Sequence, residues 1–265
     1  MKQHFLIHLV EYLGVNSLFK MKYITVSVVF LVLTQTIVAN YLTYEKCALK
    51  DSECLLKQAR AVLPSFVQGI PELGIKKLDK LHMDKITIDI PGIYAELTNL
   101  EIGGLSKATI DDVSINVPYK LLRISFNTPN LHTEFDYKLN GTLFGFPVFG
   151  EGKGQLSLKN LQTELLIIFD IVKNDQGDDI LEFKSFMYGA DAIDGLHAKL
   201  ENMYNGDKEK SDMYHEIVNK NWRIIATNYG RCFTSKFMEE LVEVFKTCIC
   251  QPLKDIAIWP EQELH

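Results

Sequence analysis

The side chains that most often do chemistry in enzymes are present in this chain, but no pattern brings them together. His82, His132, His197 and His215 each stand apart from other candidate ligands or catalytic groups, and isolated histidines are typical of surface or hydrogen-bonded positions. The sequence has no Gly-x-Ser-x-Gly elbow, no His-Glu-x-x-His motif and no Walker loop. We therefore predict no catalytic residue, no metal site and no cofactor, and we do not expect an enzyme.

Two short segments look like binding loops at first sight. The glycine-rich segment 150–154 superficially resembles a phosphate-binding loop, but such a loop needs a helix directly after it, and residues 155–158 alternate like a strand. We interpret its glycines as positions of close packing or of bulges in a sheet. The acidic segment 175–179 lacks the spacing of a calcium-binding loop and is typical of a solvated hairpin tip.

The five cysteines divide into a pair and a group of three. Cys47 and Cys54 are close enough in sequence for a small disulfide loop. Cys232 and Cys248 lie on one predicted helix, about 24 Å apart, so they cannot join each other. Because five is odd, at least one thiol, Cys250 included, must be free or intermolecular. A metal site of the last three cysteines is an alternative without histidines to support it, and we favour buried apolar thiols.

Two regions have the 3.6-residue period of an amphipathic helix. Asp51 is placed to cap a helix over residues 52–69, which a glycine and a proline then end. A longer apolar row from Met213 to Cys248 predicts one helix of about 54 Å. Gly230 lies inside this row and predicts a bend there, because glycine weakens a helix interior.

Between the two helices the period changes to two, which is the period of a strand. We predict nine or ten strands with short turns, and Asn140-Gly141 is the strongest hairpin signal among them. Short turns between neighbouring strands indicate an antiparallel meander. The strands are predicted at 84–90, 113–117, 122–126, 131–139, 142–149, 151–160, 162–173, 180–188 and 191–200, with residues 174–178 as a turn.

A sheet with one apolar face and one long apolar helix have a single economical arrangement, in which the sheet curls around the helix. We therefore predict an α+β fold, with a highly curved antiparallel β-sheet wrapped around one long C-terminal α-helix and a short N-terminal helix. No linker-like segment divides the chain after its start. Residues 40–265 are expected to form a single domain.

Residues 1–39 are expected to be a leader. Lys20 and Lys22 precede an apolar run over 23–33, and a small residue, Ala39, stands at the expected cleavage position. This is the organisation of a secretory signal peptide over 21–39. A membrane anchor is the alternative, but polar residues interrupt the run well short of the roughly 20 apolar residues that a span needs. We expect a secreted, extracellular protein.

The charge of the chain bears on its partners. There are 28 Lys and Arg residues against 34 Asp and Glu, which gives a net charge of −6, and basic residues form no block larger than a pair. The footprint of a nucleic-acid-binding protein is therefore absent, and no nucleic acid is expected as a partner. We expect a monomer.

The segment after the first two cysteines has a specific pattern. Residues 63–75 read Leu-Pro-Ser-Phe-Val-Gln-Gly-Ile-Pro-Glu-Leu-Gly-Ile, and Leu-Asp-Lys-Leu follows at 78–81. With the cysteine pair, this resembles the start of mature proteins in the insect takeout and juvenile-hormone-binding family, although Lys80 stands where the family usually has proline. Residues 140–154, 219–222 and 258–260 also look like family landmarks.

The resemblance implies a secreted carrier of a lipophilic molecule, with a fold similar to the lipid-binding TULIP proteins. The sheet region is rich in aromatic side chains, and a sheet curled around a helix can enclose a long apolar tunnel. We predict a small hydrophobic ligand there, juvenile hormone, another terpenoid or a lipid, with the Tyr137 hydroxyl as a candidate anchor for a ligand oxygen. The other residues expected to line the tunnel are Val62, Phe66, Ile70, Phe126, Phe135, Phe144, Ile225, Tyr229, Phe233 and Phe237.

Two expectations concern the surface. In the alternative function, a TULIP-like protein docks to a membrane or a partner, and ligand binding is secondary; transient membrane or receptor contact also fits the first function. Asn140-Gly141-Thr142 is an N-glycosylation sequon at a predicted exposed turn. Asn140 is therefore a candidate glycosylation site.

Overall fold

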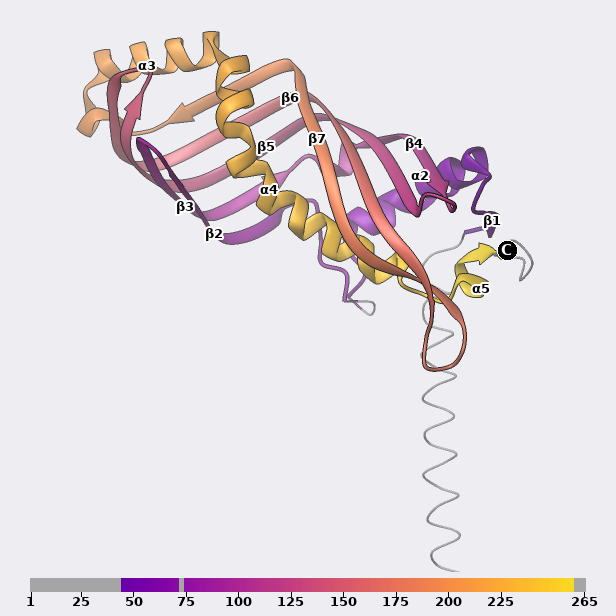
Figure 1. The fold of residues 1–265 in the computed structure, drawn as a ribbon. Coiled ribbons are helices and arrows are strands. Elements are labelled where there is room, and N and C mark those ends of the chain that lie inside the picture. Colours follow the sequence, from indigo (N-terminus) through magenta and orange to yellow (C-terminus); the bar gives the residue numbers. More distant parts are fainter. Residues whose placement is uncertain (1–43, 72–73, 260–265) are drawn as a thin grey trace, which may run out of the picture. The chain divides into compact units, whose positions relative to one another are not determined.

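The computed structural model describes residues 44–71 and 74–259, and these described residues belong to one compact unit (Figure 1). The expected signal peptide over 21–39 and the segment before it lie outside the described residues. The helices are α2 (Ser52–Gln68), α3 (Lys208–Lys220), α4 (Trp222–Ile249) and α5 (Leu253–Ile256), with 3-10 turns η2 (Leu105–Lys107) and η3 (Tyr204–Gly206). The strands are β1 (Cys47–Ala48), β2 (Leu81–Ile90), β3 (Ile93–Gly103), β4 (Thr109–Asn116), β5 (Leu121–Leu143), β6 (Phe146–Lys173), β7 (Asp179–Leu200) and β8 (Ala257–Ile258).

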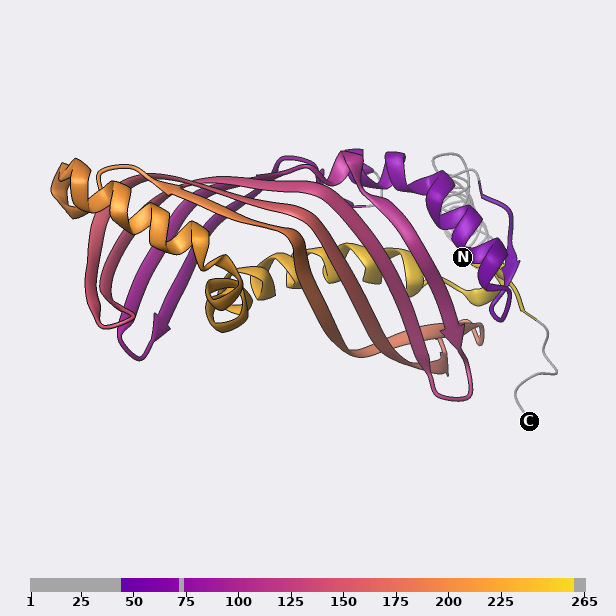
Figure 2. The same cartoon turned by 90° about the horizontal axis from the view of Figure 1, so that it is seen from above.

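Strands β2 to β7 form one antiparallel sheet in the order β2-β3-β5-β6-β7. β5 is long enough to pair with two strands on the same side: β4 along its first part, to Asn127, and β3 along its second part, from His132. The strands curve over α4, which contacts both β2 and β7, the strands at the two ends of that order (Figure 2). The predicted α+β fold, a curved antiparallel sheet with a long C-terminal helix on its inner face, is confirmed.

A line across three strands, which we call the crease, explains why the predicted strand number was wrong. Buried side chains on β5 have even numbers up to Thr128 and odd numbers from Leu131 onward, and β6 changes in the same way between Leu158 and Leu161. Between those two residues, Asn160 has φ 50°. The register with β7 shifts at the same level, beside Gly195, which has φ 116°. Left-handed residues let a strand turn its side chains over without ending. The interruption of the alternating apolar pattern inside β5 and β6 was therefore interpreted as a boundary between two strands.

The hairpin predicted at Asn140-Gly141 is also wrong. Both residues lie inside β5, and the turn is made by Phe144 and Gly145, with φ 52° and 84°. Gly141 is needed for another reason, because a Cβ there would lie 2.3 Å from the Gly92 carbonyl oxygen. The backbone of the β2–β3 turn approaches β5 at this point.

Strand β3 was missed altogether. Its alternation is interrupted at Asn99, which has φ 53° and lies in a register shift against β5. The turn predicted at 174–178 is confirmed as the connection between β6 and β7.

The long C-terminal helix is two helices. Asn221 ends α3, where its backbone N–H and its side-chain Nδ2 both donate to the Ile217 carbonyl, and α4 begins at the next residue. Asparagine competes in this way for helix carbonyls, which explains the break. The bend predicted at Gly230 is not where the helices separate, since α4 is continuous through Gly230.

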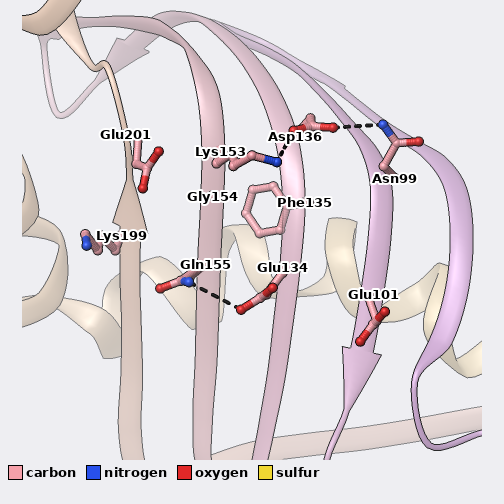
Figure 3. Close-up of a pocket in the computed structure, with 10 residues that line it drawn as sticks. All are labelled: Asn99, Glu101, Glu134, Phe135, Asp136, Lys153, Gly154, Gln155, Lys199 and Glu201. Atoms are coloured by element: carbon pink, nitrogen blue, oxygen red, sulfur yellow. Dashed lines mark hydrogen bonds and ion pairs between the residues drawn. The ribbon is translucent and has the colours of Figure 1, made fainter.

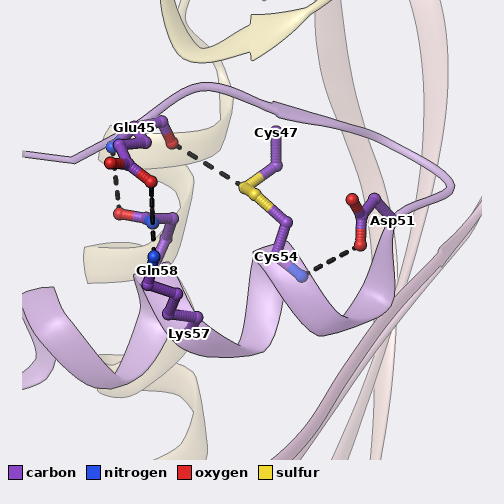
Figure 4. A network of polar contacts seen from close by, with 6 residues as sticks. All are labelled: Glu45, Cys47, Asp51, Cys54, Lys57 and Gln58. Carbon is purple, nitrogen blue, oxygen red and sulfur yellow. Dashed lines mark hydrogen bonds and ion pairs between the residues drawn. A yellow bond between two sulfur atoms is a disulfide. The ribbon is translucent and has the colours of Figure 1, made fainter.

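The N-terminal helix is confirmed over Ser52–Gln68, one residue shorter than predicted. Asp51 caps it, because its Oδ1 accepts a hydrogen bond of 3.0 Å from the Cys54 N–H (Figure 4). The disulfide between Cys47 and Cys54 is confirmed, with 5.7 Å between the two Cα atoms. Cys47 also belongs to β1, which pairs with β8 in parallel. The disulfide therefore connects α2 to the strand that holds the C-terminal segment.

Cys232, Cys248 and Cys250 are free thiols. Cys232 and Cys248 both lie on α4. Burial raises the pKa of the Cys248 thiol to about 11, so at neutral pH it is protonated and apolar in character.

Candidate ligand-binding site

An apolar cluster, which we call the inner cluster, lies where the inner face of the sheet meets η3, α3 and α4. Strands β2, β3, β5 and β6 supply most of its side chains, Met203 comes from the segment before η3, and one residue comes from each of α3 and α4. Two further rings, Tyr204 and Tyr214, pack against it and contact each other edge to face. Its buried members are Ile86, Leu97, Leu100, Phe135, Tyr137, Leu143, Val148, Met203, Val218 and Phe233.

Five of the residues expected to bind a ligand are brought together here. Phe135, Tyr137 and Phe233 are buried members of the inner cluster, and Ile225 and Tyr229 pack against it from α4. Phe135 and Tyr137 share one face of β5 because side chains two apart in a strand point the same way. Their role in binding stays a prediction.

Three others lie on or after α2. Phe66 is buried and stacks on Phe245 of α4, with 5.3 Å between ring centroids. Ile70 is buried beside Ile75, with which it forms a β-bridge, whereas Val62 is half-buried. This group is separate from the inner cluster.

The remaining three lie at different positions. Phe126 is buried on β5 on the far side of the crease, and Phe237 is buried on α4. Phe144 lies on the β5–β6 turn with 46% of its surface exposed. The structure therefore does not bring Phe144 together with the inner cluster.

The Tyr137 hydroxyl already has a partner. It donates a hydrogen bond of 2.6 Å to the backbone carbonyl of Glu201, and burial raises the pKa of Tyr137 to about 12. Its proton is thus committed to Glu201, while its oxygen can still accept. This hydroxyl suits a ligand that offers an O–H donor better than one that offers only a carbonyl.

Two other hydroxyls were not foreseen as polar anchors. Thr128 is fully buried at the crease, on the same side of β5 as Phe126, and its Oγ1 has no hydrogen-bond partner among the described residues. Tyr214 is half-buried and packs against the inner cluster. Burial is the main cause of a strongly raised pKa at Tyr214. Unpaired buried hydroxyls are uncommon in folded proteins and are costly without a partner.

A pocket of about 260 Å³ lies on the opposite face of the sheet (Figure 3). Apart from Phe135 and Gly154, its lining residues alternate along the strands with those of the inner cluster, and four carboxylates and two lysines surround it. Asn99 donates to Asp136 at 2.8 Å, and Lys153 lies 3.4 Å from the same carboxylate. These two contacts, Asn99 first, hold the pKa of Asp136 below its usual range. The pocket is lined by Asn99, Glu101, Glu134, Phe135, Asp136, Lys153, Gly154, Gln155, Lys199 and Glu201.

This polar pocket is a poor match for a lipophilic ligand. Its lining is largely charged, and an apolar ligand would displace water from these groups without replacing its hydrogen bonds. The inner cluster therefore remains the candidate site. Over the part of the chain that the structure describes, no three His, Cys, Asp or Glu side chains are placed to hold a metal ion.

Comparisons with known proteins agree with the fold. The sequence profile of the haemolymph juvenile hormone binding protein family matches residues 26–251. The circadian clock-controlled protein daywake of Drosophila melanogaster is 26% identical over 197 residues, which are 69% of this chain and 74% of that protein. A Schistocerca gregaria protein named "Putative beta-carotene-binding protein" is 27% identical over 113 residues, 42% of this chain and 45% of that protein.

A solved structure is similar over most of the chain. The crystal structure of Takeout 1 from Epiphyas postvittana matches with a TM-score of 0.77 and 28% sequence identity. The match covers 81% of this chain and all of that chain. The curved sheet and its inner helix are therefore a fold that this chain shares with a takeout protein.

Proposed function

We propose that this chain, which belongs to the haemolymph juvenile hormone binding protein family, is a secreted carrier of a small hydrophobic ligand. The observation that carries the proposal is the inner cluster, in which Phe135 and Tyr137 of the sheet face Phe233 of α4. Aromatic and aliphatic walls with few polar groups are the usual lining of a lipophilic site. The name of the Schistocerca gregaria relative supports a ligand of this kind.

The energetics of such a ligand are favourable without catalysis. A terpenoid or lipid that buries about 400 Å² of apolar surface would gain on the order of 10 kcal/mol before the costs of association. The unpaired hydroxyl of Thr128 would then orient a ligand oxygen. We infer that the ligand is mainly apolar, carries at least one oxygen and lies between the sheet and α4.

Secretion rests on separate observations. The Cys47–Cys54 disulfide is typical of an oxidising compartment, and the family is named for haemolymph proteins. In the described ranges, no helix combines the length and the apolar character that crossing a bilayer requires.

Titration with an apolar fluorophore that brightens in dry surroundings tests the carrier function. Phe233→Leu should keep the fold and weaken fluorophore binding roughly tenfold, because part of an aromatic wall is lost. Phe233→Asp should abolish binding. Ile224→Asp is the matched control, since Ile224 lies on the same helix but is exposed. Unchanged affinity in folded Phe233→Leu and Phe233→Asp would remove the inner cluster as the site.

A further inference from the structure

The hairpin between β5 and β6 has an apolar outer surface. Residues 141–150 read Gly-Thr-Leu-Phe-Gly-Phe-Pro-Val-Phe-Gly, without a charged side chain. Phe144, Phe146 and Phe149 are 46%, 65% and 37% exposed, whereas Leu143 and Val148 are buried in the inner cluster. The same short hairpin therefore closes the proposed ligand site on one side and presents phenylalanine to the surroundings on the other.

The backbone holds these rings in their exposed positions. Phe144 and Gly145 both have positive φ, and Leu143 pairs with Phe146 across the turn, which is the tight two-residue geometry that matches strand twist. Thr142 donates a backbone hydrogen bond of 2.7 Å to the Gly92 carbonyl. The β2–β3 turn consequently supports the hairpin from the side, and Figure 2 shows the two turns next to each other.

Polarity increases in steps away from the tip. Tyr94 lies opposite Asn140, is 41% exposed, and is paired on its other side with Asp89. The first charges on the hairpin strands themselves are Lys138 and Glu151, which face each other. Lys138 is six residues from Phe144, or about 20 Å along the strand. Phe144 and Phe146 thus lie nearest the turn, a row that mixes Phe149, Tyr94 and Asp89 comes next, and the paired charges follow. Side chains at a bilayer surface change in the same direction, from apolar in the hydrocarbon to charged in water.

The size of the apolar tip favours lipid over protein. At roughly 200 Å² for a whole phenylalanine, the exposed parts of the three rings present about 300 Å². A stable protein interface buries about 800 Å² on each partner, so the tip is too small to hold a second copy of this chain. A fluid lipid layer needs no matching surface and can accept a narrow hairpin.

We propose that the β5–β6 hairpin docks this protein on a lipid surface with neutral headgroups, with Phe144 and Phe146 inserted among the acyl chains. Asp89 near the tip and the net charge of −6 oppose an anionic surface. Docking places the wall of the inner cluster at the membrane, where a lipophilic ligand can enter or leave. That use of docking rests on the proposed carrier function, whereas docking itself does not.

The test is partitioning of the purified protein onto phosphatidylcholine vesicles. Phe144→Ser with Phe146→Ser should reduce the partition coefficient at least tenfold. Tyr119→Ser with Met187→Ser is the matched control, because both residues are exposed apolar side chains on other parts of the surface, and it should stay within about twofold of wild type. All variants keep the same N-terminal segment, so they differ only in the substituted side chains. Partitioning should change little between about 50 and 500 mM salt, since the tip carries no charge.

Any of three results with vesicles would overturn the proposal: no partitioning of the wild type, equal partitioning of the hairpin variant, or partitioning that requires phosphatidylserine and disappears in salt. Dimerisation of the wild type that the hairpin substitutions abolish would assign the tip to a second copy instead.

Fluorophore binding from water separates this proposal from the carrier function. The hairpin variant should bind the fluorophore with wild-type affinity and lose only its rapid transfer from vesicles; failure of all fluorophore binding would reject the carrier while leaving docking intact.

Discussion

The hydroxyl of Tyr137 donates to the backbone carbonyl of Glu201, 2.6 Å away. This bond joins the middle of the sheet to the residue directly after β7, and through it to the segment that leads into α3. Tyr137 is therefore part of the frame that holds the inner cluster as well as part of its wall.

Removing that hydroxyl should destabilise the fold modestly. Tyr137→Phe leaves the Glu201 carbonyl without its donor, and we expect the free energy of unfolding in urea to fall by about 1 kcal/mol. Tyr119→Phe is the control, because Tyr119 is 80% exposed, and it should change by less than about 0.5 kcal/mol. Equal values for the two variants would show that the bond adds nothing to stability.

Thr128 should behave in the opposite way. Its buried hydroxyl has no partner among the described residues, so Thr128→Val removes an unpaired polar group and should leave stability unchanged or raise it by up to about 1 kcal/mol. If Thr128 orients a ligand oxygen, affinity for a long-chain alcohol should fall roughly tenfold while affinity for the matching alkane stays the same. A clear loss of stability, with equal alcohol and alkane affinities, would make Thr128 a structural residue only.

His215 should make stability depend on pH. The Leu200 N–H donates to its Nε2 at 2.9 Å, which requires a neutral ring. Burial lowers its pKa below 6.5, with smaller effects from Ser211, Asp212, His197 and Lys199. The unfolded chain therefore binds this proton first as pH falls, so the contribution is complete above about pH 6.5 and is lost as pH drops through the folded pKa.

Urea unfolding between about pH 7.5 and 4.5 measures this dependence. His215→Gln keeps an acceptor for Leu200 without a titrating ring, and it should lose less stability than wild type over this range. His82→Gln, at an exposed position on β2, should keep the wild-type slope. A wild-type slope in His215→Gln would assign the pH dependence to other groups.

The disulfide should stabilise the fold mainly by restricting the conformations of the unfolded chain. Closing the small loop between Cys47 and Cys54 is worth about 2–3 kcal/mol in the chain-entropy account. Replacing both by serine should lower the free energy of unfolding by that amount and release β1 from β8, which limited proteolysis would detect. Cys232→Ser, at a free thiol, is the control and should not expose the N-terminal segment. Resistance equal to wild type in the double variant would mean that the pairing of β1 with β8 suffices.

Much of the fold could be predicted because the buried face of a helix or a strand gives the apolar residues a regular spacing in the sequence. The helix at 52–68 and its Asp51 cap followed from local chemistry, and the alternating rows indicated a sheet. Strand length could not be predicted, since the buried parity changes at Asn160 and the register shifts beside Gly195 without ending a strand. The break at Asn221 depends on a single side chain, which donates to the Ile217 carbonyl one turn earlier. The period of the apolar residues carries no sign of it.

The site was partly predictable for the same reason. Phe135, Tyr137 and Phe233 could be placed on apolar faces, and the structure brings them together. Phe144 is also a phenylalanine, but its position depends on whether the turn forms at Gly141 or at Gly145. Gly141 is instead required inside β5, where the Gly92 backbone approaches it closely. Thr128 could not be predicted as a site residue, because threonine is not part of the apolar pattern. Only the structure shows that its hydroxyl is buried without a partner among the described residues.

The most direct test of the carrier function is a native mass spectrum of the protein purified from its own tissue without detergent. A bound lipophilic molecule of a few hundred daltons should be released on collisional activation and recovered by solvent extraction. After delipidation, the protein should take up an apolar fluorophore with a stoichiometry of about one, in keeping with a single inner site. A mass equal to that of the polypeptide and any glycan, together with no uptake of the fluorophore by the folded protein, would contradict the account.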